Sequence, residues 1–531
     1  MSAAQKRLTL AAAIVGSIVA FVDGTVVNVA LPHIRDDLGG GLSGQQWLTD
    51  AYLLTLGSLL LVGGSIGDLF GRRRAFAAGL VGFGAASILC AIAPTIGTLI
   101  AFRALQGVAG ALLVPNTLGL IVARFEQTER GGAIGAWTAW SGIAIVIGPL
   151  LGGLLLQAGT WRWIFAINVI PIALALWLTS RLDATHDAPA GGQIDHIGAV
   201  LATLGLGGPV YALIEGPSRG WGDPVILVAL IGGLVLLAAF VVYEADASHP
   251  MLPLELFRQR NFTVGNAATL AVYGGLGSAP FFLVLFLQQV AGYSPIAAGA
   301  ALLPVTIIMF ALSARWGALA DRIGPRVFMG VGPLIGGAGI VWLGHMGASP
   351  DYWTDLFPAV IVFGLGLSLT VAPLTATVLG GVAEEHAGVA SAVNNATARI
   401  GSLLAVAAVG AVVAAQFSSS LKADLQGVPL PRGYLSQASS QALVADAPAT
   451  LGSARPRAQA ALDDAAVDAF GLGMTLTGLL IALGGVLSAL GIENPKRSVP
   501  CADCPGGAAV GASEDLGRVA LPRYQPAGAA R

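Results

Sequence analysis

Apolar residues occur along this chain in long stretches rather than in the short alternating pattern of a soluble fold. An α-helix rises ~1.5 Å per residue and the hydrocarbon core of a bilayer is ~30 Å thick, so about 20 apolar residues cross it. Fourteen such stretches predict an all-α polytopic membrane protein with fourteen transmembrane helices. Their ranges are 8–31, 46–66, 75–93, 98–123, 131–156, 163–180, 194–214, 224–243, 262–290, 295–314, 327–343, 357–382, 387–415 and 467–491.

Positive charge is unequally divided between the two sides of the predicted bundle. With the N-terminus inside, short loops and ends on that side carry 15 Lys and Arg residues, whereas short loops on the other side carry Arg35, Arg162 and Arg219. Cytoplasmic loops hold the excess of these residues. The sequence therefore predicts a multi-pass protein of the plasma (inner) membrane with cytoplasmic N- and C-termini.

Composition narrows the class of protein further. Of 531 residues, 55% are hydrophobic and 11% charged, and the mean hydropathy is +0.77. Soluble proteins carry about 25% charged residues, so an ordinary soluble enzyme is excluded. The net charge of -2 provides no basic field for nucleic acid.

The chain also lacks the sequence signals of a cofactor or metal site. Cys501 and Cys504 form a single CxxC with no second pair and no neighbouring His, so we expect no metal. The phosphate-binding pattern GxxxxGK[ST] does not occur. We therefore expect no enzyme activity and no cofactor, and an ion gradient rather than ATP as the energy source.

One loop pattern occurs twice, between the second and third and between the tenth and eleventh predicted helices. GSIGDLFGRRR and GALADRIGPR both place a Gly, an Asp four residues on, a Gly three further, and then Arg. The repeat predicts two six-helix halves, residues 8–180 and 262–491, with two inserted helices in 194–243. The residues of the two loops are Gly64, Asp68, Gly71, Arg72 and Arg73, and Gly317, Asp321, Arg322, Gly324 and Arg326.

Two segments do not belong to the predicted bundle. Residues 416–466 are rich in Ala, Ser, Gln and Pro, and we expect an external loop that is partly disordered or loosely helical. Residues 493–531 are rich in Pro, Gly and Ala, and we expect a flexible cytoplasmic tail.

Ionised side chains inside the apolar stretches are the main candidates for function, because each costs ~2.5 to 3.5 kcal/mol at bilayer depth. Asp23 and Arg103 lie ~12 Å and ~8 Å from the outer ends of their helices, so they can share one layer. We interpret Asp23 as a protonation site that Arg103 modulates. The alternative is a fixed ion pair that only holds two helices together. Asp50 and Asp355, near outer helix ends, are expected to be solvated.

The thirteenth predicted helix carries a second polar group, Asn394, Asn395 and Arg399. Asn395 and Arg399 are one helical turn apart and share a face. They are candidates to line a substrate cavity or to gate its inner side. In the alternative, Arg399 extends its charge to the membrane surface from a helix that begins later.

Clusters of small residues predict close packing or bending in two helices. Gly148, Pro149, Gly152 and Gly153 predict a fifth helix that bends and packs tightly between the halves. Ordinary small-residue packing is the alternative interpretation. Glycines around Pro280 suggest a broken or flexible ninth helix beside a cavity.

These motifs together resemble the major facilitator superfamily, in particular its fourteen-helix drug:proton antiporter branch, over nearly the whole length. The resemblance rests on the two loops, on DGTVVNVALP at 23–32, LIAFRALQGVAGA at 99–111 and GIAIVIGPLLGG at 142–153. Leu69 departs from the basic residue often found after the Asp. The resemblance implies the major facilitator fold, a functional fourth-helix Arg103, and an association of the fifth-helix glycines with export.

The resulting hypothesis is a proton-coupled exporter of amphiphilic, drug-like small molecules that works by alternating access. Its partners would be that substrate, protons and membrane lipid, with no nucleic acid, and we expect a monomer. One alternative is a specific exporter or symporter of a lipid, peptide, siderophore or metabolite on the same fold. The other is a non-transporting membrane scaffold, in which changes at Asp23 and Arg103 would leave every flux unchanged.

Overall fold

A computed structural model describes residues 3–183, 194–248, 250–380, 382, 387–426, 434–435, 438, 443, 447 and 449–494. Residues 1–493 form one compact unit, which contains all the helices considered below. The CxxC and the tail beyond Asn494 lie outside the described residues.

Thirteen helices within the described residues are long and apolar enough to cross a membrane. The fifth predicted span corresponds to a further helix, α5, which is not among these thirteen. The all-α membrane fold is therefore confirmed. The helices are α1 (Ala3–Leu38), α2 (Gly41–Phe70), α3 (Arg72–Ala91), α4 (Ile96–Arg124), α5 (Gln127–Ala158), α6 (Arg162–Ala166) with α7 (Val169–Ser180), α8 (His196–Arg219), α9 (Pro224–Asp246), α10 (Arg260–Gln289), α11 (Pro295–Ala300) with α12 (Leu303–Ile323), α13 (Pro325–Leu343), α14 (Phe357–Gly380), α15 (Ala387–Asp424) and α17 (Arg455–Gly491).

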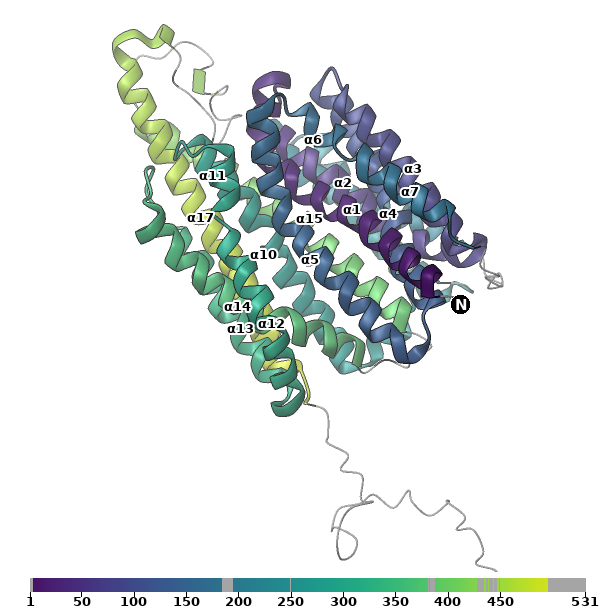
Figure 1. Cartoon of the computed structure of the whole chain (residues 1–531). Helices are drawn as coiled ribbons and strands as arrows, with labels where there is room; N and C mark the ends of the chain where they lie inside the picture. The colour runs from purple at the N-terminus through teal and green to yellow at the C-terminus, as the bar shows by residue number, and fades with distance from the viewer. Residues whose placement is uncertain are drawn as a thin grey trace, which may run out of the picture. The chain divides into compact units, whose positions relative to one another are not determined.

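The two halves repeat the same helix pairings (Figure 1). In the first half, α1 packs on α5 and α7, α3 on α7, and α4 on both α2 and α3. In the second half, α10 packs on α15 and α17, α13 on α17, and α14 on both α12 and α13. The loop repeat in the sequence thus corresponds to a repeat of the packing.

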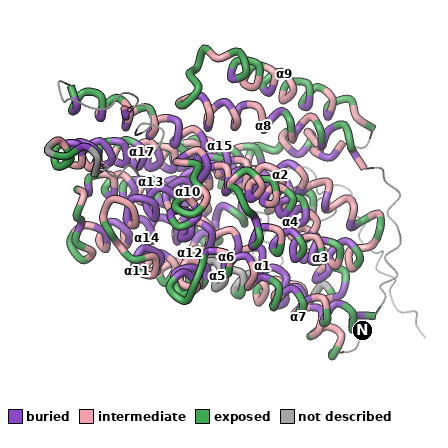
Figure 2. Tube along the Cα trace, turned by 90° about the horizontal axis from the view of Figure 1, so that it is seen from above, coloured by how far each residue is buried: buried purple, intermediate pink, exposed green. Residues whose placement is uncertain are grey.

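The inserted helices α8 and α9 pack on each other outside the two halves (Figure 2). The inner helix, α8, contacts α2 of the first half and α15 of the second. The outer helix, α9, is largely exposed along its length, and its side chains are almost all apolar. Such a face is suited to hydrocarbon rather than to water.

The sixth predicted helix is interrupted, which the apolar pattern did not indicate. The helix ends at Ala166 and starts again at Val169, with Ile167 and Asn168 between the two parts. Pro171 explains the break, because it has no N–H for the carbonyl of Ile167. By contrast, α10 is a continuous helix, so the expected break near Pro280 is absent.

The external segment is shorter than the predicted range 416–466. The helix α15 continues to Asp424 and α17 begins at Arg455, so both ends of the predicted loop are helical. The start of α17 is rich in Ala, the best helix former, and the polar residues of both ends favour water over hydrocarbon. Both helices therefore extend beyond the length that the membrane requires.

Small residues let the helices of each half approach closely. Gly63 of α2 lies against α4, where an added Cβ would be 1.9 Å from the carbonyl oxygen of Ala111. Contacts of this kind replace the hydrophobic driving force, which is absent between helices in lipid.

We expect Gly63→Val to destabilise the protein by about 1–3 kcal/mol, because the Ala111 backbone cannot move away from the new side chain. The control is Gly232→Val in α9, where an added Cβ meets no heavy atom within 4 Å. Thermal unfolding of the two purified variants in detergent measures the difference. Equal midpoints for both would contradict the prediction.

Candidate functional site

Asp23 and Arg103 are in direct contact inside the first half. Nη1 of Arg103 in α4 donates to Oδ2 of Asp23 in α1 at 2.5 Å. Asp23 is 0% exposed and Arg103 is 1% exposed, so the pair is closed off from both surfaces. The shared layer that the sequence predicted is thus occupied by a buried ion pair.

Two neutral amides complete the hydrogen bonding of the Asp23 carboxylate, and a neighbouring hydroxyl accepts from both of them. Nε2 of Gln106 and Nδ2 of Asn168 donate to its Oδ1 at 3.0 and 2.9 Å. Both amides also donate to the hydroxyl of Ser87 in α3, at 2.9 and 3.4 Å. All three are buried, so the carboxylate has a complete set of protein partners.

Sequence reasoning missed these three residues because neutral amides and hydroxyls occur in many apolar helices. Two signals were available. Gln106 is three residues after Arg103 and therefore on the same face of α4. Asn168 lies three residues before Pro171, at a site where the helix has to be interrupted.

Arg103 connects the pair to α2. Its Nε donates to the carbonyl oxygen of Leu48 at 3.0 Å, and its guanidinium lies 4.4 Å from the ring centre of Tyr52. Its Nη1 also donates to Oε1 of Gln106 at 2.6 Å. A guanidinium keeps its proton, so the carboxylate of Asp23 is the group in this cluster that can take one up.

The first repeated loop fastens α2 and α3 to α4 and α7. Asp68 and Arg72 form an ion pair at 3.0 Å, and Arg72 also donates to the carbonyl oxygen of Gly119 at 3.0 Å. Arg73 donates to the carbonyl oxygens of Thr179 and Ser180 at the end of α7.

The two glycines of this loop have separate roles. Gly64 lies against Pro115 of α4, and Gly71 has a φ of 95°, a backbone conformation that favours glycine.

The second loop reproduces three of these features. Gly324 has a φ of 111°, and Arg326 donates to the carbonyl oxygen of Ala489 near the end of α17 at 2.6 Å. Gly317 faces Ala372 of α14, as Gly64 faces α4. Asp321 and Arg322 are exposed. In both halves, therefore, an Arg two residues after the Gly of positive φ caps the last helix of its half.

The fifth-helix motif lies where the two halves meet. An added Cβ at Gly148 would be 2.0 Å from the Thr25 hydroxyl oxygen of α1, and one at Gly152 would be 3.0 Å from Val26. Gly153 faces the second half, where a Cβ would be 2.7 Å from Cα of Ile296 in α11.

Pro149 contacts the same short helix. A Cβ on Gly299 of α11 would lie 2.8 Å from the carbonyl oxygen of Pro149. Next to this contact, Nε2 of Gln288 at the end of α10 donates to the carbonyl oxygen of Val29 in α1 at 3.1 Å. The halves are therefore closed against each other at the end opposite the N-terminus.

Asn394, Asn395 and Arg399 do not converge on one point. Nδ2 of Asn394 donates to Asn266 and Thr269 of α10 at 3.2 and 2.9 Å. Asn395 is exposed and donates back to the carbonyl of its own helix.

Arg399 is half-buried and lies between the halves, since its Cβ is 3.3 Å from the position of an added Cβ on Gly57 of α2. It interacts electrostatically with Tyr52 of the first half and Tyr273 of the second. Among the described residues, no hydrogen bond joins this group to the Asp23 cluster, although Tyr52 lies next to both.

Asp50 contradicts the expectation of a solvated position. It is 0% exposed, and its two carboxylate oxygens have no hydrogen-bond partner within the described part of the chain. The error arose because α2 begins at Gly41, five residues before the predicted start, so Asp50 lies deeper in the bundle. Asp355, in contrast, is partly exposed.

Comparisons with known proteins agree with this architecture. The family described as Major Facilitator Superfamily matches residues 13–406. The puromycin resistance protein of Streptomyces alboniger is 39% identical over 74% of this chain and 78% of its own length. The methylenomycin A resistance protein of Bacillus subtilis is 35% identical over 75% of this chain and 85% of its own.

Solved structures show the same fold at much lower identity. A bacterial homologue of the human lysosomal transporter Spinster, in an inward-facing and unoccupied conformation, matches with a TM-score of 0.63 at 16% identity. The match covers 92% of this chain and 98% of that one.

We expect Asp23 and Arg103 to be strongly coupled in stability. Arg103→Gln or Asp23→Asn alone leaves one buried charge without its partner, at a cost of about 3–5 kcal/mol. The double variant removes both charges, so we expect it to be more stable than the sum of the single effects predicts. Thermal unfolding of the four purified proteins measures the coupling.

The exposed pair Arg162 and Asp37, at 2.7 Å, is the matched control and should show a much smaller coupling. Additive effects of the Asp23 and Arg103 substitutions would show that the buried contact does not contribute to stability.

Proposed function

The chain belongs to the major facilitator superfamily, and from this premise we propose that it is a proton-coupled exporter of amphiphilic, drug-like compounds across the plasma membrane. It is thus a multi-pass membrane transporter of small molecules rather than an enzyme. Its relatives confer resistance to puromycin and methylenomycin A. The single observation that carries the proton-coupled mechanism is the fully buried Asp23 carboxylate with its Arg103 partner.

Asp23 is proposed to carry the transported proton. Its carboxylate is fully paired in the closed cluster, where Arg103, Gln106 and Asn168 each donate a hydrogen bond to it. Uptake of a proton removes the attraction between Asp23 and Arg103 and leaves the guanidinium to its other acceptors. The two protonation states therefore favour different arrangements of α1 and α4.

The change at Asp23 reaches the second half through α2. Arg103 donates to the carbonyl of Leu48, and two residues earlier Nε2 of Gln46 donates to the carbonyl oxygen of Val406 in α15 at 3.0 Å. A shift of Arg103 on protonation alters the position of α2 against α15. This route joins the proton site to the contact between the halves that has to open and close during transport.

Export requires that the proposed substrate cavity between the two halves be sealed on the outer side while cargo binds from the inner side. The Gly148–Gly153 segment forms this seal by packing α5 against α1 and α11 at the end opposite the N-terminus. The Lys and Arg excess supports an orientation in which that end faces the outside of the cell and both termini are cytoplasmic. Arg399 lies between the halves, and Asn394 is on the same helix. Both are proposed to contact cargo in a monomeric transporter.

Dye efflux from intact cells tests the proposed direction and energy source. Cells that express the protein should retain less of an amphiphilic cationic dye than cells without it, and a protonophore should abolish the difference. Increased accumulation that depends on the protein would instead indicate an uptake symporter.

We expect Asp23→Asn to reduce proton-driven exchange at least tenfold while the protein remains folded, because an amide cannot take up the proton. Asp37→Asn is the matched control, since Asp37 is on the same helix but exposed and paired with Arg162. Both variants are reconstituted into vesicles, and cargo flux is measured with and without an imposed pH difference. If vesicles with the Asp23→Asn variant exchanged cargo under the pH difference as fast as vesicles with the unaltered protein, the proposed role of Asp23 would be wrong.

A further inference from the structure

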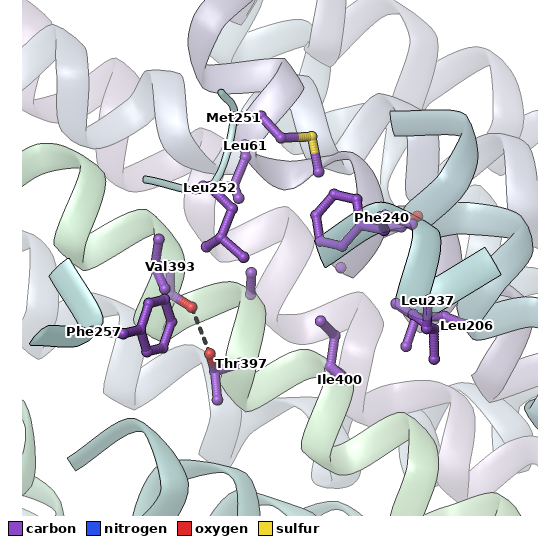
Figure 3. Close-up of a pocket in the computed structure, with 14 residues that line it drawn as sticks. Leu61, Leu206, Leu237, Phe240, Met251, Leu252, Phe257, Val393, Thr397 and Ile400 are labelled. Atoms are coloured by element: carbon purple, nitrogen blue, oxygen red, sulfur yellow. Dashed lines mark hydrogen bonds between the residues drawn. The ribbon is translucent and has the colours of Figure 1, made fainter. Parts of the chain in front are cut away.

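An apolar cavity of about 140 Å³ lies between the inserted helices and the two halves (Figure 3). Its walls come from α2, α8, α9 and α15, and from the segment after α9 that contains Met251, Leu252 and Phe257. The Asp23 cluster does not contribute to its lining, so the cavity is distinct from the proposed proton site.

The lining provides hydrocarbon rather than polar groups. Only Ser58 and Thr397 carry hydroxyls among the residues that line the cavity, and both hydroxyls are already bonded. Ser58 donates to the carbonyl of Leu54 at 2.6 Å, and Thr397 donates to that of Val393 at 2.9 Å (Figure 3). An apolar cavity of this size stays dry and accepts hydrocarbon.

The cavity extends along the membrane normal within one leaflet. Phe240 is six residues, ~9 Å, from the end of α9, and Gly57 is thirteen residues, ~20 Å, from the end of α2. Both helix ends lie on the side of the N-terminus. The lining therefore runs from near one membrane surface towards the bilayer centre, which is the path of a lipid acyl chain.

The segment after α9 that lines the cavity is held in place and carries an exposed cation directly after its last lining residue. The backbone N–H of Leu252 donates to the buried Glu244 carboxylate at 2.9 Å, which fixes the segment that forms the wall. Arg258 follows the lining residue Phe257 and is exposed, and no carboxylate pairs with it within the described residues. The next cation, Arg260, is already paired with Glu493 at 2.8 Å.

We propose that this cavity binds one acyl chain of an anionic phospholipid, whose phosphate pairs with Arg258. Hydrocarbon fills the dry cavity, and the guanidinium recognises the headgroup oxygens. The lipid thereby joins the inserted helices to α2 and α15. This site does not depend on the proposed transport function, and it gives the inserted pair a role in lipid binding.

Photocrosslinking in vesicles tests the proposal. The full chain is reconstituted in phosphatidylcholine that contains a trace of phosphatidylglycerol with a diazirine in one acyl chain, and labelled peptides are mapped by mass spectrometry. We expect labels in the 251–257 and 393–400 segments. Ala202→Phe fills the cavity and should lower this labelling at least fivefold, whereas Ala239→Phe, at an exposed position of α9, should not.

Ala396→Leu fills the same cavity from another helix and serves as a second test. Each variant is used only if it elutes as a monodisperse protein, so that loss of labelling reports loss of binding and not misfolding. Labelling that both filling variants leave unchanged, or the absence of label in these segments, would overturn the proposal. Competition by an excess of amphiphilic dye would also overturn it, because the cavity would then belong to cargo.

The headgroup contact has its own test. Arg258→Gln should reduce labelling by the phosphatidylglycerol probe at least threefold and leave labelling by a phosphatidylcholine probe unchanged. Arg7→Gln, another exposed cation on the same side, is the control. Equal labelling of the unaltered protein by the two probes would show that the cavity does not select an anionic lipid.

Discussion

The need to pair a carboxylate in a medium of low dielectric constant determines how the first half is built. A buried charge without partners costs several kcal/mol, so Asp23 requires a cation and further donors from its neighbours. Arg103, Gln106 and Asn168 supply them from α4 and from the break between α6 and α7. The proline that interrupts the sixth helix therefore serves the same site, because the break allows Asn168 to reach the carboxylate.

Sequence reasoning reached the ionised members of this site but not its neutral members. The rise of a helix per residue is sufficient to place Asp23 and Arg103 in one layer, because ionised residues are rare in apolar stretches. Amides are common there, and their importance depends on which helices are neighbours. Asp50 was misjudged for a related reason, since its depth depends on a helix start that hydropathy locates only approximately.

The repeat was predictable because its cause is local. A turn with positive φ selects glycine at Gly71 and Gly324, and an Arg two residues later reaches the carbonyls that end the last helix of each half. Both requirements appear as fixed spacings in the sequence. The inserted helices have no such pattern, and only the packing of α8 on α2 and α15 reveals that the inserted pair contacts both halves through α8.

If Asp23 carries the transported proton, as proposed, the position of its cluster limits how that proton can act on cargo. All its hydrogen-bonded members belong to the first half, and Arg399 and Asn394, the residues proposed to contact cargo, lie outside it. In the proposed mechanism, proton and cargo therefore need not compete for one group. Coupling then has to pass through packing. The bond from Arg103 to the Leu48 carbonyl places α2 in this route, and α2 also contacts α15 and forms one wall of the apolar cavity. In the proposed mechanism, α2 is held on one side by the hydrogen bond from Arg103 and borders the apolar cavity on another, so its position would respond both to protonation of Asp23 and to the proposed lipid.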